Sequence, residues 1–577
     1  QVWVLFTEVY KYYDAGLKLP DDVTIMFADD NVGNLRRLPL PSERGRSGGF
    51  GIYFHMDMHG GPFSYQWINS NPLPKIWEQM NLAYRYGANE IWIANVGDLK
   101  PLELPIEFFL AMAWRPSDVG KDKIAGWTHA WAERQFGPEH AAEIALLAAR
   151  YAKYNAWRKP EQLKPDSYSL ENYREAERVC DGWRELERRA DAVNETLRSD
   201  QRDAFYQFVL YPVRACSNLT QMYVAAARNA RFAEQGRAST SAEADEVRRR
   251  FHRDHDLRDY YNHTMAGGKW DHMMDQTHIG YFDWYPPGTD IMPPVAEIDL
   301  DPANGFGVAV DGSARSWPGY YLPPELPILD SLTREKTFIE VFPRGAGPAS
   351  VTVTADQPWV VIEEGKAFGV STRDRRFWVD IDWNAVKIGR SEATITVEGH
   401  QTVTVRLTAL RASAQQEREA RGAGGGLTGA FSLAAARFDR SVAARGVRWE
   451  PIADYGQGDA AMSVFPVDAE PFTDTANAPR LEYDVFLGES GPYHIDLVTA
   501  PTLEVYPGRH LAVAVGIDDA APVAQAVFTA TTRAAQDFLG EQHAANTAAN
   551  ARTMRFTLPV DAPGRHVLKV FMQDPTI

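Results

Sequence analysis

The first 120 residues alternate short apolar runs with amphipathic segments. Continuous apolar runs at 23–28, 51–54 and 90–94 are typical of strands that are buried on both faces of a parallel sheet. Between the last two runs, residues 76–86 carry apolar side chains at helical spacing, and Gly87 follows as a stop signal. This alternation predicts part of a (β/α)8 barrel, with too few strands for a closed one.

The hydrophobic pattern changes twice along the rest of the chain. Helical spacing dominates 121–290 and predicts a bundle of four to six helices, whereas short strand-like runs between Gly and Pro predict a β-sandwich at 291–410. Residues 411–427 are charged and then glycine-rich, as in a linker, and 428–577 resemble a second, incomplete β-sandwich. The expected fold is therefore a multidomain α and β protein, with a partial (β/α)8 barrel at 1–120, a helical bundle and two β-sandwich domains.

Composition narrows the classes of partner. The chain has 60 Lys and Arg against 77 Asp and Glu, and its net charge of −17 disfavours nucleic acid and anionic membranes as partners. Cys180 and Cys216 are the only cysteines, which excludes a disulfide scaffold and a cysteine-based zinc site. The sequence has no apolar run of membrane-spanning length. Its 16 Trp residues suit stacking on sugar faces as well as core packing.

Polar side chains follow each of the three predicted strands. In chain order they are Asp29, Asp30 and Asn31, then His55 and Asp57, then Asn95, Asp98 and Lys100. Ligands of parallel α/β sheets gather at the carboxyl ends of the strands, so we expect these side chains on one rim. Two carboxylates on such a rim suit glycoside hydrolysis, because a protonated one donates to the leaving oxygen while the other activates water.

Two other interpretations of these polar residues remain open. Asp and Asn are also favoured at helix caps and turns, where their role is structural and not catalytic. Asp30, His55 and Asp57 also suit a metal that activates water. No HExxH or HxH ligand pair accompanies them, so neither a metal nor another cofactor is expected.

Three charged candidates lie beside the predicted rim. Glu78 is expected in the first turn of a helix, where a carboxylate is either catalytic or simply favoured by the helix dipole. Arg36 and Arg37 follow the first strand end, where a guanidinium suits a ligand that bears a carboxylate; solvated loop arginines are the plain alternative.

Aromatic and histidine candidates complete the expected binding site. Trp67 follows the second strand and is a candidate for stacking on a sugar ring, with core packing as the alternative. His278 and Tyr281 end the irregular, polar and aromatic segment 267–281 and are candidate ligand contacts. A structural hydrogen bond is the commoner role for a lone histidine.

Several ordered motifs resemble glycoside hydrolase family 115. They are Ala28-Asp29-Asp30-Asn31-Val32-Gly33, Tyr53-Phe54-His55-Met56-Asp57-Met58-His59, Lys75-Ile76-Trp77-Glu78-Gln79-Met80, Ile93-Ala94-Asn95-Val96-Gly97-Asp98, residues 151–161 and 269–281, and Pro479-Arg480-Leu481-Glu482-Tyr483. The resemblance implies an inverting α-glucuronidase that removes α-1,2-linked glucuronic acid, or its 4-O-methyl form, from glucuronoxylan. It also implies a barrel, a bundle, a C-terminal sandwich, in some members a β-module like residues 291–410, and a homodimer.

The resemblance also assigns roles to acidic residues. Glu78 is the expected proton donor, and Asp98 or Asp30 is expected to position or activate water. The family's N-terminal domain and the first half of its barrel have no counterpart in this sequence. We therefore interpret it as part of a secreted or periplasmic enzyme, a part that is inactive alone; a non-catalytic carbohydrate-binding fragment is the alternative.

Overall fold

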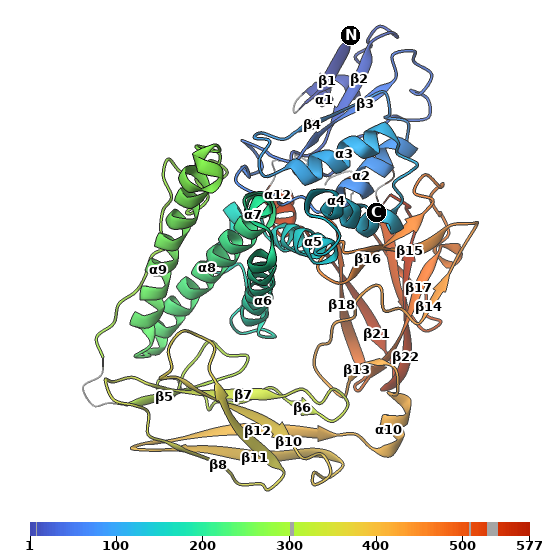
Figure 1. The fold of residues 1–577 in the computed structure, drawn as a ribbon. Helices are drawn as coiled ribbons and strands as arrows, with labels where there is room; N and C mark the ends of the chain where they lie inside the picture. Colours follow the sequence, from blue (N-terminus) through green and yellow to red (C-terminus); the bar gives the residue numbers. More distant parts are fainter. Residues whose placement is uncertain (7–8, 301–304, 507–508, 510, 528–540, 577) are drawn as a thin grey trace.

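The computed structural model describes residues 1–6, 9–300, 305–506, 509, 511–527 and 541–576. It is a mixed α and β multidomain structure with several sheets, arranged around a central group of helices (Figure 1). Within the described ranges, no helix is both long and apolar enough to cross a membrane.

The N-terminal part is a parallel sheet of four strands in sequential order. The strands are β1 (Val2–Leu5), β2 (Thr24–Ala28), β3 (Phe50–His55) and β4 (Ile91–Asn95). The sequence predicts the last three and misses β1, because so short an apolar run does not distinguish strand from helix. The inner strands β2 and β3 are almost entirely buried, as their continuous apolar runs require, whereas β4 is half-exposed.

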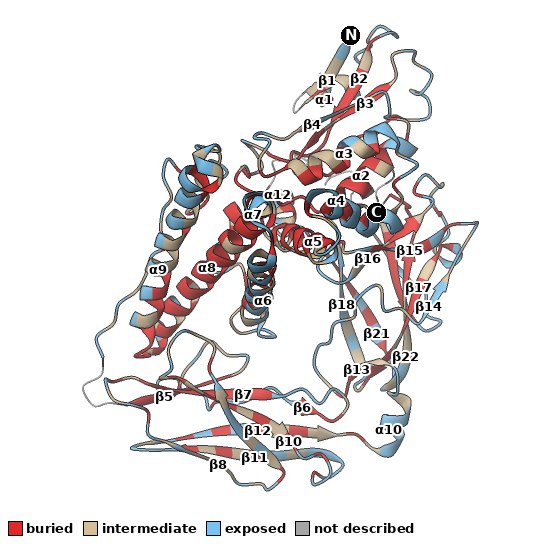
Figure 2. Ribbon diagram, viewed as in Figure 1, coloured by how far each residue is buried: buried red, intermediate tan, exposed pale blue. Residues whose placement is uncertain are grey.

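Helices follow the strands and then dominate the middle of the chain. They are α1 (Val9–Asp14), α2 (Leu73–Arg85), α3 (Glu103–Trp114), α4 (Ile124–Phe136), α5 (Ala141–Trp157), α6 (Glu175–Thr196), α7 (Ser199–Phe205), α8 (Tyr211–Gln235) and α9 (Thr240–Asp259). Helix α8 is buried along most of its length and packs against α6 and α9 (Figure 2). A helix that is buried on all faces forms the centre of its packing unit, so α8 is the axis of this helical region.

Two four-stranded sheets follow, with orders β5-β7-β10-β9 and β6-β12-β11-β8. The strands are β5 (Phe306–Val310), β6 (Leu329–Asp330), β7 (Thr337–Pro343), β8 (Thr352–Ala355), β9 (Val360–Lys366), β10 (Arg375–Ile381), β11 (Gly389–Glu398) and β12 (Thr402–Arg411). Both sheets contribute to one hydrophobic core, for example Val308 and Val379 from the first and Ile395 and Val405 from the second. Alternating side chains of each sheet therefore meet in a shared interior.

The C-terminal part holds the remaining sheets. Its elements are α10 (Ala414–Glu419), β13 (Gly424–Gly426), β14 (Arg440–Val442), β15 (Arg448–Ala453), β16 (Ala460–Phe465), β17 (Arg480–Leu487), β18 (Gly491–Thr499), β19 (Ala512–Ile517), β20 (Val523–Ala526), α12 (Glu541–Ala548), β21 (Arg552–Val560) and β22 (Gly564–Met572). Segment 411–427, which the sequence suggests as a linker, contains α10 and β13. Strand β13 pairs with β17 of the main C-terminal sheet.

This C-terminal part packs back on the N-terminal sheet and its helices. The backbone N–H of Leu38 donates to the carbonyl of Val505 at 3.0 Å, and the hydroxyl of Tyr86 donates to that of Val467 at 3.0 Å. Tyr506 belongs to the same hydrophobic cluster as the buried side chains of β2, β3 and α8. Helix α12 reaches the loops that follow β2 and β3, because Nε2 of His543 lies 2.7 Å from Oδ2 of Asp30 and Ala548 packs against the cluster of Val32, Phe63 and Tyr65.

Candidate functional site

Asp29 and His55 join the carboxyl ends of the adjacent strands β2 and β3. The backbone N–H of His55 donates to Oδ2 of Asp29 at 2.8 Å, and its ring Nδ1 lies 2.6 Å from Oδ1 of the same carboxylate. Both side chains are buried. Burial alone lowers the pKa of His55, but the charge of Asp29 and its hydrogen bond raise that pKa above its usual value. The pair therefore binds the two strand ends to each other.

Asp30 is fully buried, and both oxygens of its carboxylate accept hydrogen bonds. Its Oδ1 accepts from the backbone N–H groups of Val32 and Asn34, at 3.0 and 2.9 Å, and its Oδ2 accepts from Nδ2 of Asn34 at 2.7 Å. Nε2 of His543, on α12, lies 2.7 Å from Oδ2. Burial raises the pKa of Asp30, but His543, Lys75 and Asn34 outweigh it and lower the value to about 2. Asp30 is thus an ionised anchor for its loop.

Asn31 takes the left-handed backbone conformation, with φ +67°, which asparagine tolerates better than most residues. Its Nδ2 donates to the carbonyl of Gly61 at 2.8 Å, and its own carbonyl accepts from the hydroxyl of Tyr65 at 2.8 Å. Its buried Oδ1 has no hydrogen-bond partner within the described chain. That oxygen is an acceptor left free at the rim.

Asp57 follows β3 and packs against the loop after β4. A Cβ on Gly97 would lie 2.5 Å from Oδ2 of Asp57, so only glycine fits there, at φ +54°. Nδ2 of Asn95 donates to the carbonyl of Asp57 at 3.2 Å. Burial and the charges of Glu161 and Asp98 raise the pKa of Asp57 to about 6. Asp98 itself is exposed. The ends of β3 and β4 therefore bring one partly desolvated and one solvated carboxylate together.

Glu161 is a rim carboxylate that the strand-end rule misses. It lies in the short turn Pro160–Gln162 after α5, and its Oε1 accepts from the backbone N–H groups of Gln66 and Trp67 at 2.8 and 2.9 Å. Its buried Oε2 has no hydrogen-bond partner among the described residues. The available signal was the family-like segment 151–161, which ends at this residue.

Two buried lysines, Lys75 and Lys159, compensate for the charge of these carboxylates; no role for either is predicted from the sequence. Nζ of Lys75 donates to the carbonyl of Val32 at 2.9 Å; Nζ of Lys159 donates to Oγ of Ser70 at 2.8 Å and lies 3.7 Å from the ring centroid of Tyr65. Burial, with the nearby charge of Lys75, lowers the pKa of Lys159 to about 7. The interior of the site thus holds both signs of charge at low dielectric.

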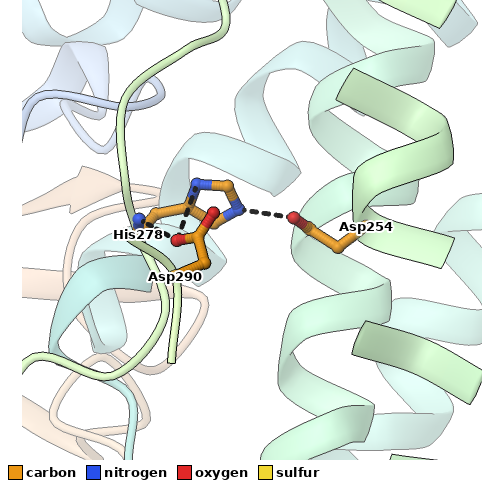
Figure 3. A group of neighbouring side chains, drawn as sticks. All are labelled: Asp254, His278 and Asp290. Atoms are coloured by element: carbon orange, nitrogen blue, oxygen red, sulfur yellow. Dashed lines mark hydrogen bonds and ion pairs between the residues drawn. The ribbon is translucent and has the colours of Figure 1, made fainter. Parts of the chain in front are cut away.

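Trp67 is buried and faces His278 of the helical region. The two rings stack at 3.6 Å between centroids and 3° between planes. Figure 3 shows Asp254 reaching His278 from a helix, α9, while Asp290 comes from the neighbouring non-helical segment. Among the described residues, Asp254, His278 and Asp290 form a group close enough to hold a metal ion. In this structure they hydrogen bond to one another and to the backbone, and Asp30, His55 and Asp57 are not in such a group.

Glu78 lies in the second turn of α2, not in the first as the sequence predicts, because α2 begins at Leu73. Its Oε2 accepts from Nε2 of Gln79 at 2.5 Å, and it hydrogen bonds to Tyr455 of the C-terminal part. Burial raises its pKa to about 7, against the opposing effects of Gln79, Lys75 and Tyr455. These contacts place Glu78 at the junction with the C-terminal part.

The two candidate arginines contact groups behind the rim. Arg37 is buried and pairs with Glu43 at 2.9 Å, and the guanidinium carbon of Arg36 lies 4.5 Å from the ring centroid of Tyr10. In this structure, both guanidinium groups therefore contact other side chains of the chain.

Lys100 and Tyr281 also have partners within the chain. Nζ of Lys100 donates to Oε1 of Glu103 at 2.6 Å. The buried hydroxyl of Tyr281 donates to the carbonyl of Thr277 at 3.3 Å. The rim thus gathers Asp29, Asp30, Asn31, His55, Asp57, Asn95 and Asp98, whereas Glu78, Arg36, Arg37, Lys100 and Tyr281 make their contacts elsewhere.

Comparisons with known proteins agree with the family resemblance. Residues 1–162 match the model of glycosyl hydrolase family 115, and residues 427–577 match that of the glycosyl hydrolase family 115 C-terminal domain. Among solved structures, the chain is similar to a 4-O-methyl-alpha-glucuronidase of family GH115, BtGH115A, with specificity for decorated arabinogalactans. That match has a TM-score of 0.62 and 19% identity, and covers 100% of this chain and 56% of the other.

Two further comparisons add little. A secreted serine protease from Vibrio cholerae gives 9% identity over 47% of each chain and a TM-score of 0.13, which indicates no shared fold. No curated protein matches the chain. The two family matches lie on either side of helices α6 to α9 and the central β region, and the match to the family 115 structure covers the full chain; the chain belongs to glycoside hydrolase family 115.

Proposed function

We propose that the protein containing this chain is a glucuronidase-type glycoside hydrolase that removes α-1,2-linked (4-O-methyl)glucuronic acid from glucuronoxylan or its oligosaccharides. The observation that carries the proposal is the pair of carboxylates at adjacent strand ends, Asp57 and Asp98, with different environments. Asp57 has a pKa raised to about 6, so it keeps a proton in mildly acidic solution, while Asp98 is exposed to water. In glycosidases, two carboxylates in such different environments take the roles of general acid and general base.

The proposed mechanism is inverting acid and base catalysis. Asp57 donates a proton to the leaving xylose oxygen, and Asp98 activates a water on the opposite face of the sugar. Asp30, with four hydrogen bonds to its oxygens, holds the rim in place. We assign the proton donor to Asp57 rather than to Glu78 because Asp57 lies at a strand end among other carboxylates, whereas Glu78 contacts Tyr455.

The proposed architecture follows the family. We interpret the sequential parallel sheet β1 to β4 as part of a (β/α)8 barrel, whose active sites lie at the strand C-termini. The paired sheets β5 to β12 are interpreted as a β-sandwich, as are the C-terminal sheets, and the full-length protein is proposed to be a homodimer.

The choice of polysaccharide is the part of the proposal that needs a direct test. The similar solved structure is described as specific for decorated arabinogalactans. We expect the complete protein to release (4-O-methyl)glucuronic acid from glucuronoxylan with or without a chelator. Uronate-decorated arabinogalactan serves as the competing substrate. Release from arabinogalactan alone would change the substrate class, chelator-sensitive release would favour a metal-dependent hydrolase, and no release from either would favour a binding-only protein.

A further inference from the structure

The helical region contributes a histidine that braces the rim from behind. We propose that His278 is a positioning residue, which acts through the ring and backbone of Trp67 to hold the carboxylate of Glu161 beside Asp57. The catalytic meaning of this inference rests on the proposed function. The stack of His278 on Trp67 and the backbone hydrogen bonds to Glu161 are features of this structure.

His278 is placed to carry a positive charge. Its Nδ1 lies 2.8 Å from the carbonyl of Gln276, and its Nε2 lies 3.0 Å from Oδ2 of Asp254 on α9. Both neighbours only accept hydrogen bonds, so both ring nitrogens must donate, and a ring with two N–H groups is an imidazolium. Asp290 adds a second carboxylate, with Oδ1 4.0 Å from Nδ1. Although burial opposes the charge, Asp254 and Asp290 raise the pKa of His278 to about 9.

The imidazolium holds the indole of Trp67. The rings are parallel within 3° at 3.6 Å, and both side chains are buried. A cation over an aromatic face is attracted most strongly where water is excluded. The stack therefore fixes the ring of Trp67, and with it the backbone at this position.

The backbone beside that ring holds Glu161. The N–H groups of Gln66 and Trp67 both donate to Oε1, which leaves Oε2 without a hydrogen-bond partner among the described residues. After burial, Glu161 is the strongest influence that raises the pKa of Asp57. If the brace is lost, Glu161 moves, and Asp57 loses a negative neighbour that favours its protonated form.

The test replaces His278 in the complete protein and titrates Asp57 directly. The variants are His278→Gln and, if that variant does not fold, Asp254→Asn, which removes the counter-charge instead. Selective 13C labelling of aspartate side chains reports the pKa of Asp57 by NMR, with the signal assigned from Asp57→Asn. We expect the pKa of Asp57 to fall by about half a unit or more in either variant. His272→Asn, an exposed histidine of the same segment, is the matched control and leaves that pKa unchanged.

Activity provides an independent readout. In the variants we expect kcat to fall about tenfold with KM changed less than about twofold, and the alkaline limb of kcat/KM to move to lower pH. An unchanged Asp57 pKa in a folded variant overturns the inference whether or not the protein is active. A wild-type protein that releases no uronic acid overturns the proposed function instead, since the carboxylate titration does not depend on turnover.

Discussion

Nε2 of His543 lies 2.7 Å from Oδ2 of Asp30, although the two residues are 513 positions apart in the chain. Asp30 follows β2 of the N-terminal sheet, and His543 lies on α12 of the C-terminal part. Both are buried. The C-terminal part therefore supplies a hydrogen-bond partner to the loop that carries the first carboxylates of the rim.

Replacing His543 by alanine should destabilise the rim. The change leaves a buried, ionised carboxylate with one partner fewer, which costs about 1–3 kcal/mol. We expect the first transition in a calorimetric scan at neutral pH to move to lower temperature. His494→Ala is the control, because His494 contacts Thr557 on an exposed face. Equal melting profiles for His543→Ala and the wild type would show that the contact contributes nothing.

Asp30 should also make stability depend on pH in the acid range. Its pKa is about 2 in the folded chain against a usual 3.8, so the carboxylate binds protons less readily when folded. The resulting stabilisation, of about 2 kcal/mol, is complete above about pH 4 and is lost as the pH falls towards 2. The melting temperature of the wild type should therefore fall over this window more steeply than that of Asp30→Asn, and parallel curves would contradict the assignment.

The strand-end residues were predictable because their signal is local. An apolar run that stops at a polar cluster marks the end of a buried strand, and this rule finds Asp29, Asp30, His55 and Asp57. It does not find Glu161, which lies in a turn after a helix, or His543, which comes from a helix distant in sequence. Tertiary packing alone brings these two to the rim.

The start of α2 explains why Glu78 lies one turn later in the helix than the sequence predicts. The apolar spacing predicts the helix from residue 76, whereas α2 begins at Leu73 with Pro74 in its first turn. Proline is favoured in the first turn because the backbone N–H groups there have no acceptor within the helix, so the N–H that proline lacks is not needed. The spacing of apolar residues does not show how many helical residues come before the first apolar one. The three-residue difference moves Glu78 into the second turn and its contacts to Tyr455.

Asp57→Asn should abolish release while making the protein more stable. In the wild type, a folded pKa of about 6 means that ionisation at neutral pH works against folding, and the loss grows as the pH rises from about 4 through 6. An amide removes that cost, on the order of 1–3 kcal/mol, but supplies no acidic proton. The wild-type activity should fall above about pH 6 for the same reason. Activity retained in a stabilised Asp57→Asn variant would exclude Asp57 as the proton donor.

Gly97→Ala should disturb the same carboxylate sterically. The added Cβ would lie 2.5 Å from Oδ2 of Asp57, at a φ of +54° that alanine tolerates poorly. Gly87→Ala is the matched control, because Gly87 also has a positive φ and a Cβ there would meet its nearest atom at 3.9 Å. Both variants carry a strain of about 1–2 kcal/mol, but only Gly97→Ala should lower kcat, by about tenfold or more. If the two variants have equal activity and equal stability, the close approach of Gly97 to the Asp57 carboxylate does not matter for catalysis.

Glu78→Gln distinguishes the two candidate proton donors. Because Glu78 contacts Gln79 and Tyr455 rather than the rim, we expect release to stay within about threefold of wild type.

The stability of the same variant should depend on pH. The folded pKa of Glu78, about 7, lies above the usual 4.5, so ionising this carboxyl destabilises the fold increasingly as the pH rises from about 4.5 to 7. The amide avoids that cost, and the variant should melt higher than wild type at pH 8 but near it at pH 4. Tyr455→Phe removes the same junction contact without touching the carboxyl and serves as the control. A loss of release above about a hundredfold with an unchanged melting profile would assign the proton transfer to Glu78, since removal of a general acid costs about that much.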